Sequence, residues 1–168
     1  MIESIEKRRS IRRFEPDKPV TKEQLKRLLE AAMLAPSACN SRPWEFIAVT
    51  NRQQLDKIAW IHPHARMCAT AAAAIIIIGI PQTNGLSVGY YPQDCSAAAQ
   101  NILLEAVSIG LGACWSGIYP INELIQPFRE HFKIEEPKIP FCVIPIGVPA
   151  ETPGQRGFYE ESKVTFLE

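Results

Sequence analysis

A cluster of cationic side chains near the N-terminus is the first feature of this sequence that could do chemistry. The segment Lys7–Phe14, KRRSIRRF, holds five basic residues within seven positions. Guanidinium groups match phosphate oxygens as planar forks, and a serine hydroxyl adds a further donor. In an extended chain Arg8, Ser10 and Arg12 point the same way, so one face of the segment could bind a single phosphate. On charge alone, a solvated basic end of a short helix explains the segment more simply.

Two further segments offer groups that a ligand could meet. In Ala35–Phe46, APSACNSRPWEF, small polar residues between two prolines form a stiff loop with hydroxyl and amide groups, anchored by Trp44 and Phe46. In Gly110–Gly117, GLGACWSG, glycines and small residues would let a ligand ring approach the backbone closely. Each segment also has a purely structural interpretation, as an ordinary helix-to-strand loop and as strand packing.

The C-terminal part adds one more candidate. The stretch Ile146–Pro149, IGVP, ends a predicted strand, and Arg156 follows in Pro153–Arg156, PGQR. Arg156 could complete an anion site, although a surface arginine in a loose tail is the more common outcome. The extension 150–168 is rich in Pro, Gly and charge, so we expect it to wrap a neighbouring subunit or to lack a fixed structure.

Several kinds of site have no support in the sequence. His62 and His64 lie close together but lack the helical i, i+4 spacing of a metal site, and we predict no metal. No GxSxG, GxGxxG or P-loop motif is present, so a hydrolytic triad and the common nucleotide fingerprints are unsupported. Scattered cysteines without a CxxC pair predict buried free thiols in a reducing cytoplasm: Cys39, Cys68, Cys95, Cys114 and Cys142.

Length and composition limit the class of protein. The 168 residues suit a single domain, residues 1–168, and 18 Lys and Arg balance 18 Asp and Glu, which disfavours nucleic acid as a partner. The N-terminus has no apolar signal region, and the longest apolar run, 68–80, is shorter than the roughly 20 residues of a membrane span. We therefore predict a cytoplasmic protein that binds neither membrane nor nucleic acid.

The hydrophobic pattern predicts helices that alternate unevenly with strands. We expect helices over 2–9, 21–34, 51–59, 94–109 and 121–128, and strands over 44–50, 75–78, 113–116 and 141–148. Thr21 and Asn51 are the predicted N-caps of two of these helices. Four consecutive isoleucines, Ile75 to Ile78, indicate a strand that is buried on both faces.

Taken in order, the four candidate segments resemble the FMN-dependent nitroreductase family over nearly the whole chain. RRSIRRF resembles the family's R-x-S-x-R/K flavin-phosphate segment, and PSACNSRPWEF resembles its PSxxNxQPW loop. GLGACWSG resembles the glycine-rich turn after the long central helix, and IPIGVP with a following basic residue resembles the C-terminal part. The resemblance implies an α+β fold of three layers, α-β-α, with a central, mainly antiparallel sheet flanked by helices, in an intertwined homodimer.

The resemblance also implies a flavin site at the dimer interface, in which the flavin carries the chemistry and no side chain is catalytic. The phosphate, ribityl chain and pyrimidine edge would be held by Arg8, Arg9, Ser10, Arg12 and Arg156. The other subunit would contribute Pro36, Ser37, Ala38 and Asn40. The isoalloxazine would be bordered by Trp115, Ser116 and Gly117, with a backbone N–H there meeting flavin N5. Arg42 departs from the family pattern, which has Gln, and Arg13 is expected at the surface.

The activity implied by the resemblance is a two-step cycle. Hydride passes from NADH or NADPH to FMN and then to an electron-poor small molecule such as a nitroaromatic compound or a quinone. Arg12 would stabilise the anionic reduced flavin. Three alternatives stay open: a non-catalytic flavin-binding or storage protein, another flavin reduction such as dehalogenation or ene reduction, and a nucleic-acid module with residues 8–13 as its basic arm. Neutral total charge argues against the last.

Overall fold

An antiparallel sheet forms the middle layer of the structure, a computed structural model that describes residues 1–154 and 157–167. Five strands lie in the order β1-β2-β5-β3, with β4 also paired to β5, and every neighbouring pair is antiparallel. Their bounds are β1 Trp44–Val49, β2 Ala73–Gly79, β3 Gly112–Ala113, β4 Ser116–Gly117 and β5 Ile139–Gly147. The mainly antiparallel sheet predicted for the fold is thereby confirmed.

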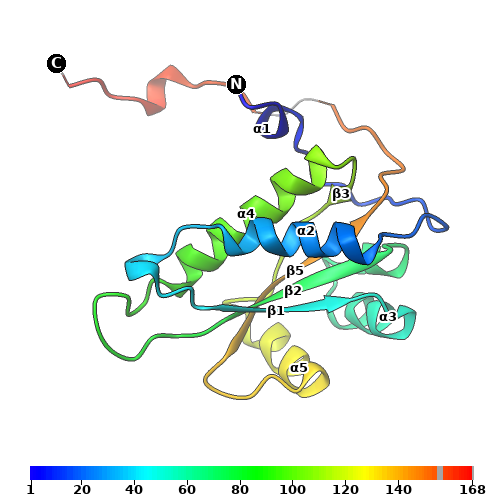
Figure 1. The fold of residues 1–168 in the computed structure, drawn as a ribbon, viewed down its shortest axis with the longest axis horizontal. Coiled ribbons are helices and arrows are strands. Elements are labelled where there is room, and N and C mark those ends of the chain that lie inside the picture. The colour runs from blue at the N-terminus through cyan, green and yellow to red at the C-terminus, as the bar shows by residue number, and fades with distance from the viewer. Residues whose placement is uncertain (155–156, 168) are drawn as a thin grey trace.

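Helices cover both faces of the sheet. Figure 1 shows α2 (Lys22–Met33) and α4 (Tyr91–Ser108) on one face, and α3 (Arg52–Ile61) and α5 (Asn122–Phe132) on the other. These three layers confirm the predicted α+β class. Short helical segments complete the described chain: α1 Glu3–Lys7, η1 Ala38–Asn40, η2 Arg66–Ala69 and η3 Glu161–Lys163.

The four isoleucines of β2 form the centre of both cores, as predicted. Ile75 and Ile77 belong to the cluster under α2 and α4, whereas Ile76 and Ile78 belong to the cluster under α3 and α5. None of the four side chains is more than 4% exposed. Because successive side chains of a strand point to opposite faces, one apolar run holds both helical layers, at roughly 1.5–3 kcal/mol for each buried side chain.

The helix caps follow the prediction, and some element bounds do not. Thr21 forms a capping box with Gln24, and Asn51 accepts the N–H of Gln54 at 3.1 Å. The predicted helix 94–109 begins earlier, at Tyr91, because Pro92 is tolerated in a first helical turn. The predicted helix 121–128 continues to residue 132.

The strand predicted over 113–116 is instead two short strands, β3 and β4. Cys114 donates its N–H to the carbonyl oxygen of Pro145 on β5 at 3.3 Å. Proline has no N–H to return, so the ladder is interrupted between the two strands.

The N-terminal segment 10–15 adds to the sheet edge in an extended conformation. Bridges join Ser10 to Ala113 and Phe14 to Pro149. The side chains of Ile11 and Phe14 lie over Gly112 and Gly147, where an added Cβ would come within 2.8 and 2.9 Å of them. Gly112 therefore serves strand packing, which is one of the two interpretations that the sequence allows for the segment Gly110–Gly117.

The C-terminal part of the described chain, 157–167, runs away from the three layers in Figure 1. Its large apolar side chains are exposed: Phe158, Tyr159, Val164, Phe166 and Leu167. Within residues 1–154 and 157–167, no helix has both the length and the apolar character of a membrane span. The cytoplasmic location and the wrapping of a partner by 150–168 stay predictions.

Gly112→Ala should destabilise the fold by about 1–3 kcal/mol, because the new methyl group overlaps Ile11 and overpacking strains its neighbours. Urea unfolding measures the change. Gly154→Ala is the control, since nothing lies within 4 Å of an added Cβ there. Equal midpoints for Gly112→Ala and the native protein would contradict the packing role of Gly112.

Candidate functional site

Two cavities meet at Arg12. The first, the arginine cavity, has a volume of about 260 Å³ and is lined by Arg8, Arg9, Ser10, Arg12, Glu151 and Pro153. The second, the histidine cavity, has a volume of about 530 Å³ and is lined by Arg12, His62, Pro63, His64, Arg66, Met67, Cys114, Trp115, Ser116 and Gly117. Arg12 lines both, so a cavity lined by cationic side chains and a wider, partly apolar one share this residue.

The arginine cavity brings together the N-terminal residues that the sequence singled out. Arg8, Ser10 and Arg12 line the same hollow because the segment is extended and alternate side chains share a side. Arg9 lines it too, and its guanidinium donates to the carbonyl oxygens of Glu6 at 2.8 Å and Gly154 at 3.1 Å. Arg9 therefore joins α1 to the C-terminal segment while keeping its charge.

A carboxylate already lies among these cations. Glu151 accepts the backbone N–H of Arg12 at 2.5 Å and that of Arg13 at 3.1 Å through one oxygen. Within the described residues, no ion pair joins the side chains of Arg8, Arg9 or Arg12 to a carboxylate. The cavity is therefore electropositive, and Glu151 offsets part of that field.

At the histidine cavity, the backbone N–H and C=O of Gly117 on β4 face away from β5. The N–H groups of Cys114 and Ile118 donate to carbonyl oxygens of β5 at 3.3 and 3.0 Å. Since alternate residues of a strand direct their backbone groups to the same side, Gly117 directs its N–H and C=O away from β5. On that side the C=O of Gly117 meets Nε2 of His62 at 2.9 Å.

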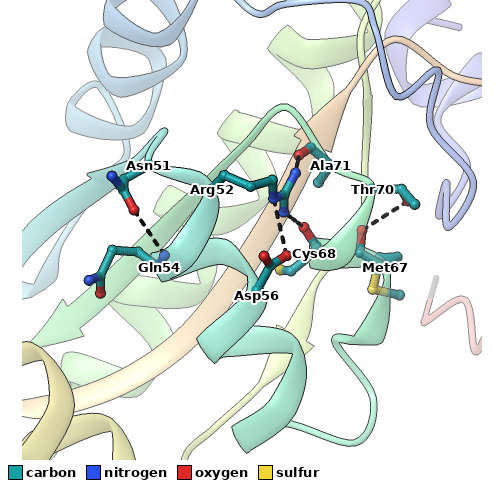
Figure 2. Close-up of polar contacts among 8 residues, drawn as sticks. All are labelled: Asn51, Arg52, Gln54, Asp56, Met67, Cys68, Thr70 and Ala71. Carbon is teal, nitrogen blue, oxygen red and sulfur yellow. Dashed lines mark hydrogen bonds and ion pairs between the residues drawn. The ribbon is translucent and has the colours of Figure 1, made fainter.

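The opposite wall of the histidine cavity is the segment around η2, which Arg52 of α3 holds in place. Figure 2 shows the Arg52 guanidinium reaching the carbonyl oxygens of Cys68 and of Ala71, the latter at 2.9 Å, and Asp56 at 3.1 Å. Because one rigid side chain binds two carbonyls of this segment, Arg66 and Met67 are presented to the cavity from a fixed backbone.

The cysteines are not nucleophiles of this site. Cys114 lines the histidine cavity, but burial raises the pKa of its thiol despite the nearby cations Arg12 and Arg8. Burial likewise raises the pKa of Cys68 and of Cys95 to about 12. All five cysteines are free, and four of them are buried as predicted, whereas the prediction of burial is wrong for Cys39, which is exposed in the loop before β1. Nor does the described chain contain three or more His, Cys, Asp or Glu grouped for a metal ion.

The predicted loop Pro36–Asn40 lines neither cavity. It packs against the N-terminus of α4, where Asp94 accepts the N–H of Ala38 at 3.0 Å. The arginine segment lies near the other end of α4, beside α1 and β3 (Figure 1). An 18-residue helix is about 27 Å long. One chain therefore cannot bring the loop and the arginine cavity onto the same small ligand.

The backbone from Pro36 to Arg42 nevertheless has an unusual conformation. Three non-glycine residues have left-handed φ angles: 52° at Cys39, 52° at Asn40 and 49° at Arg42. Such conformations cost free energy and persist where the surroundings impose them. Ser37 contributes by accepting the N–H of Arg42 at 2.9 Å. The loop is thus held by hydrogen bonds at Ala38 and Ser37 and exposes Cys39 and Asn40.

The structure adds residues that the sequence did not single out, and one predicted residue is outside its range. His62, His64, Arg66 and Met67 join the predicted Trp115, Ser116 and Gly117 in the histidine cavity, and Glu151 joins the arginine cavity. The close pair of His62 and His64 is visible in the sequence, but its spacing gives information only about metal binding. Arg156 lies outside the described residues.

Comparisons with known proteins agree with this architecture. The model of the Nitroreductase family matches residues 5–66 and 64–148. A protein of Methanothermobacter thermautotrophicus, named as a candidate NADH dehydrogenase/NAD(P)H nitroreductase, is 44% identical over 164 residues, 98% of this chain and 85% of that protein. A structure from Bacteroides thetaiotaomicron with the same name has a TM-score of 0.90 at 40% identity, covering 98% of this chain and 95% of that one. An FMN-dependent nitroreductase of Clostridium difficile has a TM-score of 0.83 at 32% identity, covering 98% and 94%.

The chain belongs to the nitroreductase family. The fold and the relatives thus confirm the predicted family, the predicted three-layer fold and the prediction of an oxidoreductase.

Glu151→Gln should make the arginine cavity bind anions more tightly. The amide oxygen still accepts from the two backbone N–H groups, while the negative charge beside Arg8, Arg9 and Arg12 is removed. We expect inorganic phosphate to bind about three- to tenfold more tightly in a ³¹P NMR titration. Glu45→Gln, a charge change on β1, is the control. Unchanged affinity in Glu151→Gln would show that this carboxylate does not face the bound anion.

Proposed function

We propose that this protein is an FMN-dependent oxidoreductase that uses NADH or NADPH to reduce an electron-poor small molecule such as a nitroaromatic compound or a quinone. The observation that carries the proposal is the meeting of the two cavities at Arg12. A phosphate group requires fixed cations, and an adjoining ring requires a wider hollow with apolar walls. The relatives named as NAD(P)H nitroreductases and as an FMN-dependent nitroreductase support the same assignment.

The donor set fits FMN at both ends. Arg8, Arg9 and Ser10 would hold the phosphate with guanidinium and hydroxyl donors. Trp115 and Met67 supply apolar and polarisable surface in the histidine cavity, and Gly117 directs a backbone N–H toward the same space. Arg156 stays a predicted phosphate ligand.

When bound, FMN supplies the two-electron chemistry, by accepting hydride from the nicotinamide and delivering it to the acceptor. The chain itself binds, orients and stabilises charge. Arg12, at the junction of the cavities, and Arg66, in the histidine cavity, place fixed positive charge where the reduced ring is negative. In this proposal the flavin carries the chemistry, and no side chain is assigned as a general acid.

The working unit in this proposal is a homodimer. The loop Pro36–Asn40 exposes Cys39 and Asn40, yet it lies at the far end of α4 from the arginine cavity of its own chain. A second copy can bring its loop to the cavity that the first copy cannot complete. The exposed aromatic residues of 157–167 give that second copy apolar surface to bury.

Combined Arg8→Ala and Arg12→Ala substitutions should abolish the yellow colour of the purified protein. Two guanidinium groups that bind the phosphate and the ring edge are lost, so FMN should bind at least about a hundredfold more weakly. Equilibrium dialysis with FMN measures the loss. Arg13→Ala is the control, because the side chain is exposed and lines neither cavity. A colourless native protein that ignores added FMN would refute the proposal.

Stopped-flow reduction separates an enzyme from a flavin store. In the proposed enzyme, NADH or NADPH bleaches the flavin absorbance, and a quinone or nitroaromatic acceptor restores it over many turnovers. The result expected for a flavin store is bound FMN that neither nicotinamide reduces. A screen of halogenated and unsaturated acceptors then distinguishes dehalogenation and ene reduction from nitroreduction.

Replacing two exposed phenylalanines of the C-terminal segment by aspartate should dissociate the proposed homodimer. Phe158→Asp with Phe166→Asp places charge where we propose that the partner's surface lies, so light scattering after gel filtration should give about 19 kDa instead of twice that mass. FMN affinity should fall with it, because each site loses the other copy's loop. Trp60→Asp on α3 is the control, since Trp60 is 77% exposed and lies on a different helix. A native protein of 19 kDa with full FMN affinity would contradict the homodimer.

A further inference from the structure

His62 is a fully buried histidine whose imidazole ring makes two hydrogen bonds, both to backbone groups. It is 1% exposed, and Phe128 of α5 packs edge-on against its ring. Its Nε2 lies 2.9 Å from the carbonyl oxygen of Gly117, and its Nδ1 lies 3.1 Å from the backbone nitrogen of His64. Neither side chain of the histidine pair had a role in the binding scheme above.

These two partners fix the tautomer of the imidazole. A carbonyl oxygen can only accept, so Nε2 of His62 carries the proton and donates to Gly117. A backbone N–H can only donate, so Nδ1 must be unprotonated to accept from His64. The ring is therefore neutral and carries its proton on Nε2.

The same contacts join the two walls of the histidine cavity. His62 binds the carbonyl of Gly117 on β4, and the hydroxyl of Ser116 on β4 returns a hydrogen bond to the carbonyl of His64 at 3.1 Å. The N–H of Gly117 points to the same side as the carbonyl that His62 holds. That N–H belongs to the peptide between Ser116 and Gly117, so the contacts of Ser116 with His64 and of Gly117 with His62 hold the strand on both sides of it.

We infer that His62 is a positioning residue of the flavin site, which as the neutral Nε2–H tautomer holds Gly117 so that its N–H faces the ring of the bound flavin. The inference rests on the proposed function for its ligand, whereas the tautomer and the contact with β4 belong to the protein alone. A further consequence is that acid disturbs the position of the ring, because the bond from His64 to Nδ1 is replaced by a repulsion that displaces the ring from Gly117, although Nε2 keeps its proton. A proton added to Nδ1 would face the N–H of His64, and two donors cannot share one hydrogen bond.

The groups around His62 disfavour the protonated form of its ring. Arg12, His64 and Arg66 line the cavity beside His62, Phe128 covers the ring from α5, and the cavity lining contains no carboxylate that could stabilise a cation. Burial, with His64 adding to it, holds the pKa of His62 below its ordinary value of 6.5, although the bond to Gly117 acts in the opposite direction. Since the unfolded chain takes up this proton first, stability falls as the pH drops from about 6.5 through the lowered pKa of the folded state.

Two substitutions at His62 each remove one of the two hydrogen bonds of the imidazole ring and keep the other. His62→Gln keeps an N–H donor near the position of Nε2 but loses the acceptor for His64. His62→Asn keeps an acceptor near the position of Nδ1 but loses the donor to Gly117. If His62 acts through Gly117, FMN should bind about tenfold more weakly to the Asn variant and within about threefold of the native protein to the Gln variant. His64→Gln is the control for charge in the cavity.

The pH dependence of FMN affinity distinguishes a positioning role of His62 from a purely structural one. The native holoprotein should lose FMN as the pH falls through the lowered pKa of His62, while the Gln variant, which has nothing to titrate there, should lose it less steeply. The phosphate of FMN titrates near pH 6 in both and cancels in the comparison. Equal pH profiles, or equal loss of affinity in two folded variants, would overturn the inference.

The tautomer is measured on the native protein and needs no variant to fold. A ¹H–¹⁵N correlation spectrum of the histidine rings at pH 7 should show His62 neutral and protonated on Nε2. An Nδ1–H signal, or a cationic ring at pH 7, would overturn the inference even if FMN binds as proposed. Conversely, a protein that ignores FMN but gives the Nε2–H signal would refute the proposed function and leave the contact with β4 in place.

Discussion

The docking of residues 10–15 on the sheet edge is the interaction on which the site depends. Backbone bonds join Ile11 to Ala113 at 3.0 Å and Glu15 to Val148 at 2.9 Å, so the segment behaves as a short extra strand. Ile11 points inward onto Gly112, which turns its neighbours Ser10 and Arg12 outward, and Phe14 anchors the end of the segment against Gly147. Cations on a loose arm would have to be ordered when a ligand arrives, whereas these are ordered by the fold, so binding does not carry that entropic cost.

Such ordering concentrates positive charge, and two kinds of contact accommodate these cations. Arg9 directs its donors to backbone carbonyls, which satisfies its hydrogen-bonding capacity without neutralising it. Glu151 brings a carboxylate to the backbone N–H groups of Arg12 and Arg13 and reduces the repulsion among the cations. The same carboxylate opposes an incoming anion. Stability without ligand and affinity for ligand are therefore balanced against each other at one side chain.

Features set by local sequence were predictable, and those set by distant pairing were not. The burial of Ile75–Ile78, the caps at Thr21 and Asn51, and the shared side of Arg8, Ser10 and Arg12 follow from periodicity and short-range bonds. The types of residues along the sequence do not show which distant segments pair or how they are aligned. His62 meets Gly117 across 55 positions, and Glu151 meets Arg12 across 139.

The break between β3 and β4 has the same origin. It arises because Pro145 falls opposite Cys114, and that alignment exists only once β5 is paired. The N-terminal part of α4 was missed for a different reason, since Pro92 in a first turn resembles a helix breaker when only the sequence is read. The positions of the element ends, unlike their existence, therefore needed the structure.

The length of α4 connects the fold to the proposed dimer. Its N-terminal turn supports the loop Pro36–Asn40 through Asp94, and its C-terminal end lies beside the arginine segment. A two-fold axis presents the same surface from both copies, so a site that needs both ends of α4 requires the two α4 helices to run antiparallel. In that arrangement one axis completes two identical sites at once. A helix shortened by a turn would move loop and cations out of reach of each other by about 5 Å, so the span of α4 is as much a part of the site as the arginines.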